Sequence, residues 1–190
     1  MIVIGMPTRG ELRAETASDL ISLTKYTKRD TMFLPAIGSY IPNNRNGLVT
    51  AAMQVGASHL LFIDSDMRFP ADTIDEFLNT HVGIIAANCR QRTQDAWTAR
   101  KNGQWVSSAG RSGIERVDSV GTGVMMIDMN VFRGLEPPWF PFEWDAGTGK
   151  YVGEDVGFCR KATAAGYQIW IDHTLSQQVR HIGTVELGAQ

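Results

Sequence analysis

Short apolar runs alternate with segments of helical spacing along the first half of the chain. Each run closes in turn residues, which is typical of a buried strand. The expected strands are Ile2–Met6, Thr31–Ile37, His59–Ile63 and Val82–Ala87. Between them, apolar residues three or four positions apart predict helices through Leu20–Leu23, over Asn46–Val55, and from Phe69 through Leu78. Such strand-helix units favour a parallel sheet covered by helices on both faces.

After Asn88 the pattern changes to hairpins and single strands. Asn102-Gly103, flanked by Trp97–Lys101 and Gln104–Ser108, predicts a β-hairpin. The remaining expected elements are strands at Val124–Ile127 and Gln168–Ile171, an aromatic loop at Pro137–Pro141, and a helix at Asp155–Ala165 ended by Gly166. We therefore expect one domain, with a nucleotide-binding-like half at about 1–88, a mixed-sheet half at about 89–184, and a tail at 185–190.

Composition and charge fit an ordinary globular protein. The 190 residues are 43% hydrophobic and 20% charged, with a net charge of −2, which gives no general reason to expect nucleic-acid or membrane binding. No segment approaches the roughly 18 apolar residues of a membrane span. Cys89 and Cys159 lie far apart and lack metal-ligand spacing. We interpret them as reduced core residues of a cytoplasmic protein.

The strongest chemical feature is the triplet Asp64-Ser65-Asp66, which directly follows the strand His59–Ile63. In an extended chain, the first and third residues point to the same side. Two carboxylates placed in this way suit Mg²⁺ or Mn²⁺ held against a diphosphate. Such triplets also occur on solvated turns, so the position after a buried strand is what favours the metal interpretation.

Other polar residues follow the ends of neighbouring strands. Ligands of open α/β sheets bind beyond the carboxyl ends of the strands, so Pro7-Thr8-Arg9, Gly38-Ser39 and the aspartate triplet are expected around one crevice. Asn43–Asn46 opens the second predicted helix. Its N–H groups and the Arg45 guanidinium could meet a phosphate, with simple helix capping as the alternative.

Two later features could complete a reaction centre. Glu154 and Asp155 begin a predicted helix, where they either favour the helix dipole or present a general base at the rim of the cleft. His181 follows the last strand and could return to the metal, although a lone histidine is more often structural. Trp139, Trp144 and Trp170 are core or rim aromatics, and the sequence does not show which of them could stack on a sugar.

Taken in order, these motifs resemble a small GT-A glycosyltransferase, similar to family 2 enzymes. The resemblance extends from Ile2 to Gly183 and rests on five features: an early strand, a strand ending in Asp-x-Asp, a Gly-x-Gly strand, Gly-Glu-Asp before a helix, and a late His-Ile-Gly. It implies an α/β GT-A-like domain with a Rossmann-like N-terminal half and a central, mostly parallel mixed sheet flanked by helices. The chain is short for this family and lacks an obvious acceptor region.

The resemblance also implies roles for individual residues. Asp64 would contact the donor ribose or the metal, and Asp66 and His181 would be metal ligands. Asp155, beside Glu154, would be the catalytic base. The expected donor-binding residues are Pro7, Thr8, Arg9, Ser39, Arg45, Asp64 and Ser65. A nucleotide-sugar donor and Mn²⁺ or Mg²⁺, with Mn²⁺ favoured, are the expected substrate and cofactor.

The expected reaction is sugar transfer to an acceptor hydroxyl with inversion, although retention remains open if Asp155 only positions the acceptor. Arg45, Arg90 or Arg92 could help to neutralise the leaving phosphate. A nucleotidyltransferase is one alternative, but Met6–Gly10 is a poor version of its glycine-rich loop. A non-catalytic nucleotide-sugar or glycan-binding module is another. The acceptor could be a small molecule, a glycan, a protein or a modified DNA base.

Overall fold

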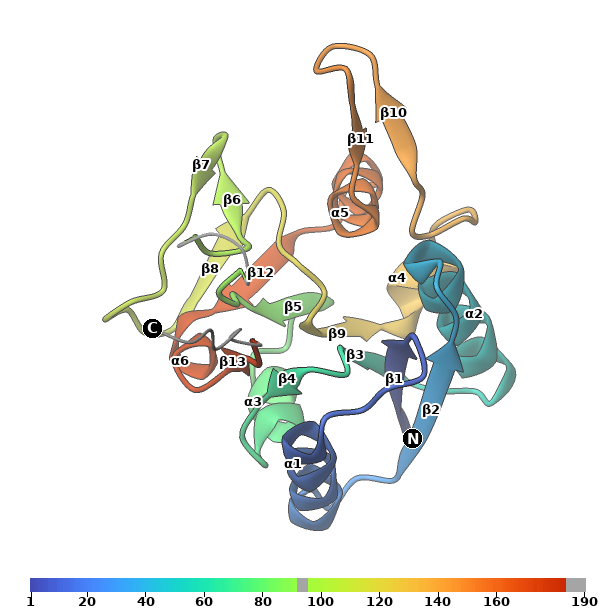
Figure 1. Cartoon of the computed structure of the whole chain (residues 1–190), viewed down its shortest axis with the longest axis vertical. Coiled ribbons are helices and arrows are strands. Elements are labelled where there is room, and N and C mark those ends of the chain that lie inside the picture. Colours follow the sequence, from blue (N-terminus) through green and yellow to red (C-terminus); the bar gives the residue numbers. More distant parts are fainter. Residues whose placement is uncertain (92–95, 184–190) are drawn as a thin grey trace, which may run out of the picture.

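The computed structural model describes residues 1–91 and 96–183 (Figure 1). A seven-stranded sheet with the order β2-β1-β3-β9-β5-β12-β8 forms the centre of the described chain. Its strands are β1 (Ile2–Thr8), β2 (Thr31–Ile37), β3 (His59–Ile63), β5 (Ile84–Ala87), β8 (Ile114–Val117), β9 (Val124–Asp128) and β12 (Ile169–Asp172). Three two-stranded ribbons accompany it: β4 (Met67–Arg68) with β13 (Arg180–His181), β6 (Arg100–Lys101) with β7 (Gln104–Trp105), and β10 (Glu143–Asp145) with β11 (Lys150–Val152).

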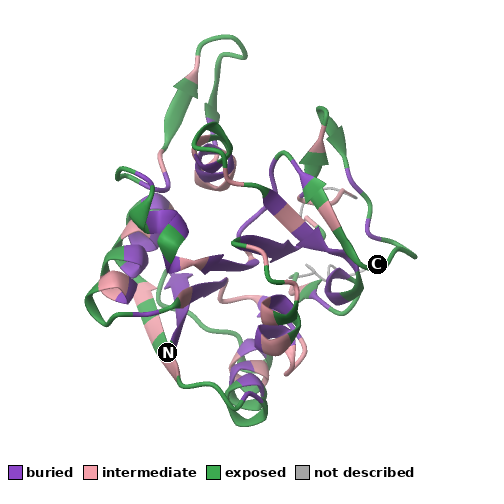
Figure 2. Ribbon diagram, turned by 180° about the vertical axis from the view of Figure 1, so that it is seen from behind, coloured by how far each residue is buried: buried purple, intermediate pink, exposed green. Residues whose placement is uncertain are grey.

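Helices cover both faces of the sheet, as the alternation of apolar side chains in its strands requires. In β3, Leu60 and Phe62 enter one hydrophobic core, whereas Leu61 and Ile63 enter the other. The first core is closed by α2 (Ile41–Gln54), α4 (Met129–Arg133) and α5 (Glu154–Ala164). The second is closed by α1 (Ala14–Tyr26), α3 (Thr73–Asn79) and α6 (His173–Ser176). Figure 2 shows the buried strands between these layers.

The sheet is mixed but mostly parallel. Strands β2, β1 and β3 are parallel neighbours, and so are β5 and β12. β9 runs antiparallel between β3 and β5, and β8 is an antiparallel edge strand beside β12. Five of the seven strands therefore point the same way and end at the same edge. This confirms the predicted α/β class and brings several loops to one side of the sheet.

Most of the predicted elements are present, with some different boundaries. The predicted span of β2 is confirmed, and β1 continues to Thr8. The hairpin around Asn102-Gly103 is also present, and both turn residues have the positive φ that this turn type needs.

Two helix starts were predicted wrongly. α2 already begins at Ile41, because Pro42 suits a first helical turn. Arg45 therefore lies inside the helix and is not at its open end. α3 begins only at Thr73, behind Asp72 as its N-cap residue, so Phe69–Asp72 precedes the helix.

Several short elements were not anticipated. β8 carries the charged pair Glu115 and Arg116 in a strand at the sheet edge, so it lacks the apolar run that marks the central strands. The β10–β11 hairpin projects from the body above α5 (Figure 1). Cys89 and Cys159 are buried thiols, and burial raises the pKa of each to about 12.

Within residues 1–91 and 96–183, no helix is long and apolar enough to cross a membrane. Arg92 and the expected tail at 185–190 lie outside the described residues.

Candidate active site

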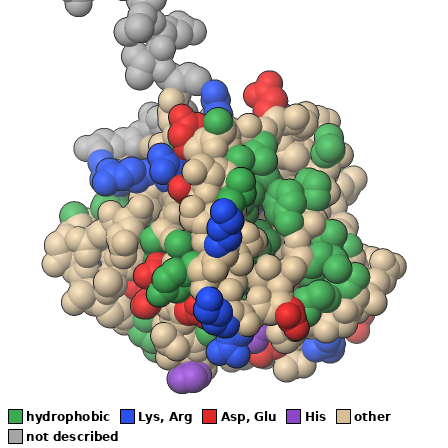
Figure 3. Space-filling model, turned by 90° about the horizontal axis from the view of Figure 1, so that it is seen from below, with side chains coloured by type: hydrophobic (Ala, Val, Ile, Leu, Met, Phe, Trp, Pro, Cys, Tyr) green, Lys and Arg blue, Asp and Glu red, His purple; other side chains and the backbone are tan. Residues whose placement is uncertain are grey.

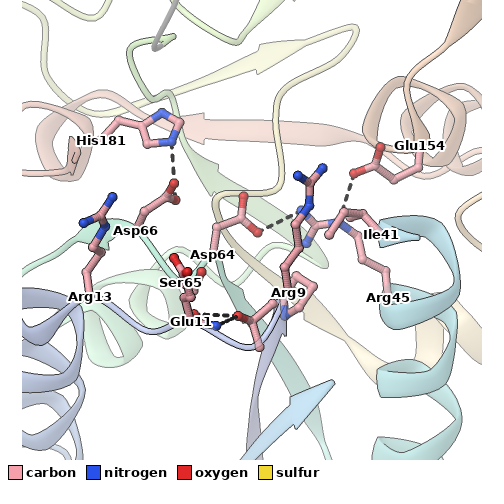
Figure 4. A pocket seen from close by; sticks show the side chains of 12 residues that line it. Arg9, Glu11, Arg13, Ile41, Arg45, Asp64, Ser65, Asp66, Glu154 and His181 are labelled. Carbon is pink, nitrogen blue, oxygen red and sulfur yellow. Dashed lines mark hydrogen bonds and ion pairs between the residues drawn. The ribbon is translucent and has the colours of Figure 1, made fainter. Parts of the chain in front are cut away.

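A pocket of about 450 Å³ opens at the carboxyl ends of β1 and β3 (Figure 4). The strand ends meet there because β1 and β3 are parallel neighbours. Its lining residues are Pro7, Thr8, Arg9, Glu11, Arg13, Ile41, Arg45, Asp64, Ser65, Asp66, Glu154 and His181. Predicted site residues from five separate parts of the sequence therefore share one pocket.

The turn after β1 is held by Thr8. Its Oγ1 accepts hydrogen bonds from the backbone N–H groups of Gly10 and Glu11, both at 3.1 Å, and donates to the Glu11 carbonyl at 2.5 Å. Gly10 has a φ of 111°, which disfavours a residue with a side chain. The N–H of Arg13 then donates to the Ser65 carbonyl at 3.1 Å. This bond ties the loop after β1 to the aspartate triplet.

Arg45 links the two acidic motifs beneath the pocket. Its Nη2 donates to Asp64 Oδ1 at 2.9 Å, and its Nε donates to Glu154 Oε1 at 3.1 Å. The side chain is only 4% exposed, and its guanidinium carbon lies 5.4 Å from the centre of the Phe62 ring. Although burial opposes it, the charge of Asp64 and Glu154 raises the pKa of Arg45. Arg45 therefore stays cationic between two carboxylates.

Asp66 and His181 meet on the other side of the pocket (Figure 4). Asp66 Oδ1 lies 3.4 Å from His181 Nε2. The approach is set by the β4–β13 ribbon, in which His181 pairs with Met67, and by the Ile182 N–H, which donates to the Asp66 carbonyl at 2.8 Å. The short ribbon therefore returns the late histidine to the aspartate triplet.

Asp66 and His181 are the two predicted metal ligands that face each other. Asp66 and His181 supply one oxygen and one nitrogen donor, a composition that Mn²⁺ accepts. Asp64 turns toward Arg45, and among the described residues no group of three or more His, Cys, Asp or Glu side chains could hold a metal ion. Sites for Mg²⁺ beside phosphates often take only one or two carboxylates, with phosphate oxygens and water as the other ligands. Asp66 could supply the carboxylate of such a site, whereas the imidazole of His181 suits Mn²⁺ better than Mg²⁺.

Glu154 and Asp155 occupy the first turn of α5, behind Gly153 as the N-cap residue. Glu154 lines the pocket. Asp155 is not a lining residue, and its Oδ1 accepts from the Val156 N–H at 2.7 Å. Burial, and then the charges of Glu154 and Asp64, raise the pKa of Asp155 above its ordinary value. A carboxylate with a raised pKa is a better proton acceptor.

Ser39 is exposed and does not line the pocket. Glu11, Arg13 and Ile41 do line it, although they were not predicted as site residues. Glu11 and Arg13 follow the turn after β1, so the position of that turn could have suggested them. Ile41 enters because α2 begins earlier than the periodicity indicated.

A second polar cluster lies apart from the pocket. Ser108 Oγ lies 2.8 Å from His173 Nδ1, and His173 Nε2 lies 3.0 Å from Glu115 Oε2. The order serine, histidine, carboxylate is that of a hydrolase relay, but Ser108 has no exposed surface. Its Oγ also accepts from Asn88 Nδ2 at 3.0 Å. We interpret this cluster as a structural network that joins β8, α6 and the end of β5.

No protein-family model and no curated protein matches the sequence. Solved structures do match the fold. A197 from STIV superposes with a TM-score of 0.64 at 13% identity, over 100% of this chain and 97% of that one. TarS of S. aureus, residues 1–349 in complex with UDP-GlcNAc, superposes with a TM-score of 0.56 at 13% identity, over 98% of this chain. The chain spans 59% of that TarS fragment.

At this identity the likeness concerns the fold alone. The chain has a GT-A-like, glycosyltransferase-like fold, in agreement with the architecture expected from its motifs.

Proposed function

We propose that the chain is a glycosyltransferase that moves a sugar from a nucleotide-sugar donor to an acceptor hydroxyl. The observation that carries the proposal is the convergence of the β1 turn, the aspartate triplet, Glu154 and His181 on one pocket. The fold likeness to TarS, which was solved with UDP-GlcNAc, supports the same donor class. The order of motifs favours a relative of the family 2 enzymes. The two buried, free cysteines favour the cytoplasm as the place of action.

The pocket would receive the donor with its nucleoside near Thr8 and Arg9 and its diphosphate near Asp64, Ser65 and Asp66. Four carboxylates line the pocket, Glu11, Asp64, Asp66 and Glu154, together with three guanidinium groups, Arg9, Arg13 and Arg45. A diphosphate would add to this excess of negative charge. A divalent cation bound with the donor would offset it.

Asp66 and His181 would hold that cation, and Asp64 would contact the donor ribose or the cation itself. Mn²⁺ is favoured over Mg²⁺ because Mg²⁺ prefers oxygen ligands alone. When bound, the cation would act as a Lewis acid on the departing diphosphate. Arg45 would keep Asp64 in position through their hydrogen bond, and Arg9 and Arg13 could donate to phosphate oxygens.

Asp155 would accept the proton of the acceptor hydroxyl, with Glu154 beside it at the pocket wall. The raised pKa of Asp155 suits this role, because a more basic carboxylate removes a hydroxyl proton more readily. The acceptor oxygen would attack the anomeric carbon opposite the diphosphate. The new glycosidic bond would therefore have inverted configuration.

A donor screen that needs no acceptor tests the proposal. The protein is incubated with UDP-, GDP-, ADP- and dTDP-sugars, with and without Mn²⁺, and nucleotide release by slow hydrolysis is measured. We expect release from one nucleotide class and at least tenfold less without the cation. Release of pyrophosphate from a nucleoside triphosphate would instead favour a nucleotidyltransferase. If neither release nor donor binding is found, the proposal is wrong.

Matched variants separate the pocket from the rest of the surface. Asp66→Asn removes one negative charge from the expected cation site and should abolish cation-dependent release. Asp30→Asn makes the same change at an exposed residue at the opposite, amino end of the strands. It should release nucleotide at the rate of the unaltered protein. Equal losses in both variants would contradict the assignment of the pocket.

A further inference from the structure

An exposed aromatic cluster lies on the β10–β11 hairpin. Trp144 and Tyr151 are directly opposite each other in the ribbon, and Phe142 shares their face because it precedes Trp144 by two residues. The three residues are 58%, 61% and 47% exposed, respectively. The other face carries Val152, which is buried against the body of the protein. Glu143 and Lys150 on that other face are exposed, so both faces of the hairpin meet solvent, and the aromatic residues gather on one of them.

The rings form a continuous surface that reaches α2. Phe142 stacks on Tyr151 with their centroids 4.7 Å apart, and Trp144 meets Tyr151 edge-to-face at 5.0 Å. Tyr40, which precedes α2 and is 47% exposed, contacts Phe142 edge-to-face at 6.1 Å. We call these four residues, Tyr40, Phe142, Trp144 and Tyr151, the aromatic platform. Contacts among the rings hold their orientations without burying them.

The platform adjoins the candidate active site through two connections in the chain. Tyr40 is followed directly by Ile41, which lines the pocket. Tyr151 is three residues before Glu154, another lining residue, and β11 leads into α5 through Gly153. A molecule that rests on the platform would therefore lie at the side of the pocket where α5 begins. This is where the base of the proposed reaction would meet an acceptor.

We propose that the aromatic platform binds a neutral carbohydrate acceptor, an inference that rests on the proposed function. One face of a pyranose ring carries C–H groups and can lie flat on an aromatic ring, while its hydroxyls stay in water. Exposed tyrosine and tryptophan side chains combine such an apolar face with a polar tip. Of the three tryptophans that could stack on a sugar, Trp139 is buried and Trp170 is half-buried in β12, whereas Trp144 is mostly exposed.

The charges around the platform favour an uncharged ligand. The hairpin carries Glu143, Asp145 and Lys150, and Asp145 is paired with Arg160 at 3.6 Å. Aromatic rings could also stack on nucleic-acid bases, but binding to a nucleic-acid backbone requires clustered basic residues. The hairpin supplies only one. Figure 3 shows the molecule from below, on the side away from the hairpin, and there basic and acidic side chains are interspersed as well.

Binding of neutral oligosaccharides tests the platform without a donor. Cellohexaose, chitohexaose, maltohexaose and mannohexaose are titrated by calorimetry and by tryptophan fluorescence. We expect at least one of them to bind with a dissociation constant of about 1 mM or tighter. Trp144→Ala and Tyr151→Ala should each weaken binding at least tenfold. Trp105→Ala is the matched control, because Trp105 is also exposed on a hairpin, away from the pocket, and it should leave binding unchanged.

The outcomes separate this inference from the proposed function. If the platform variants lose oligosaccharide binding but still release nucleotide from the donor, both proposals stand. If nucleotide is released but no oligosaccharide binds, or Trp105→Ala weakens binding equally, the platform assignment is wrong. A dimer that becomes a monomer in Trp144→Ala would assign the surface to a second copy of the chain and would also overturn it. If oligosaccharides bind but no donor does, the transferase proposal fails and the platform remains as a sugar-binding surface.

Discussion

Arg45 Nη2 donates to Asp64 Oδ1 across 2.9 Å, and this contact joins a buried cation to the first residue of the aspartate triplet. The same guanidinium bonds to Glu154, which lies 109 positions further along the chain. Its Nη1 is buried and has no hydrogen-bond partner among the described residues. Arg45 thus links the proposed donor site to the first residue of α5, which directly precedes the proposed base Asp155.

Replacement of Arg45 by Met should therefore impair both stability and turnover. Removal of one member of a fully buried ion pair costs about 3–5 kcal/mol. The Asp64 and Glu154 side chains are 32% and 20% exposed and can regain water. We therefore expect Arg45→Met to lower the free energy of unfolding, measured in urea, by about 2 kcal/mol. Nucleotide release should fall at least tenfold, because Asp64 loses its fixed orientation.

Arg45→Lys is the matched variant for charge. A lysine keeps the cation but cannot donate from two separate nitrogens in the fixed fork of a guanidinium. We expect its stability to lie between those of the unaltered protein and Arg45→Met. If Arg45→Lys were as stable and as active as the unaltered protein, the charge alone would matter and the bridging geometry would not.

Asp155→Asn should stabilise the protein at neutral pH while it abolishes transfer. Because the folded-state pKa of Asp155 is raised, its carboxylate is disfavoured by folding, and the protein loses stability as the pH rises through the unfolded and then the folded pKa. Asparagine is neutral, so the variant should unfold at a higher temperature at pH 7. The difference should vanish at low pH, where Asp155 is protonated. Thermal unfolding of both proteins across pH 3–8 measures this difference in unfolding temperature.

Asp145→Asn provides the opposite case. Hydrogen bonds from the backbone of Thr148, and then of Gly147, lower the pKa of Asp145, so its charged form is favoured by folding. The substitution of Asp145 should therefore not raise the unfolding temperature at pH 7.

Donor binding should survive in Asp155→Asn, since the Asp155 carboxylate does not line the pocket. If Asp155→Asn still transferred sugar to an acceptor, Asp155 would be excluded as the base.

The sequence predicts the central strands well because burial on both faces requires uninterrupted apolar runs. The span of β3 follows directly from this requirement. β2 is a half-exposed edge strand, and its span is predicted by its apolar run although it is not buried on both faces. The position of Asp64-Ser65-Asp66 at a strand end follows from the same pattern. The site is therefore predictable wherever a functional residue is adjacent to a central strand.

Contacts made by helices and short ribbons are less predictable. The Arg45–Glu154 pair depends on how α2 and α5 pack over the sheet, which local periodicity does not encode. The approach of His181 to Asp66 depends on a ribbon whose two strands have two residues each. Such short strands give no periodic signal. The aromatic face of β10–β11 does alternate in sequence, but the pattern alone does not show that it is exposed.

Gly157→Ala should disturb the position of α5. A Cβ atom at Gly157 would lie 2.9 Å from the Pro141 carbonyl oxygen and 3.0 Å from Pro141 Cγ, and a backbone oxygen cannot move as a flexible side chain does. We expect the free energy of unfolding, measured in urea, to fall by about 1–3 kcal/mol. Sugar transfer should also fall, because Glu154 and Asp155 begin the displaced helix.

Gly47→Ala is the control for this substitution. Gly47 lies in α2, and a Cβ atom there would meet nothing within 4 Å. Alanine is a better helix former than glycine, so we expect the free energy of unfolding to rise by about 0.5–1 kcal/mol and the activity to stay unchanged. If both variants were stabilised alike, the packing of α5 against Pro141 would not restrict the helix.

Glu115→Gln should weaken the fold without affecting the pocket. The Glu115 carboxylate accepts from Lys101 Nζ at 2.8 Å and lies 2.7 Å from Arg111 Nη2 and 3.0 Å from His173 Nε2. The bond from Lys101, and then those from His173 and Arg111, lower the pKa of Glu115 from 4.5 to about 2. The charged form therefore stabilises the protein above pH 4.5, and this contribution is lost as the pH falls toward 2.

In urea unfolding at pH 7, we expect Glu115→Gln to cost about 1–3 kcal/mol. Between pH 4.5 and 2 its deficit should shrink, because the unaltered protein loses the same interaction by protonation. Glu136→Gln, at an exposed position, should leave the unfolding midpoint unchanged at every pH. Nucleotide release should be equal in all three proteins, since neither residue lines the pocket. A constant deficit across this pH range would mean that Glu115 acts through packing rather than through its charge.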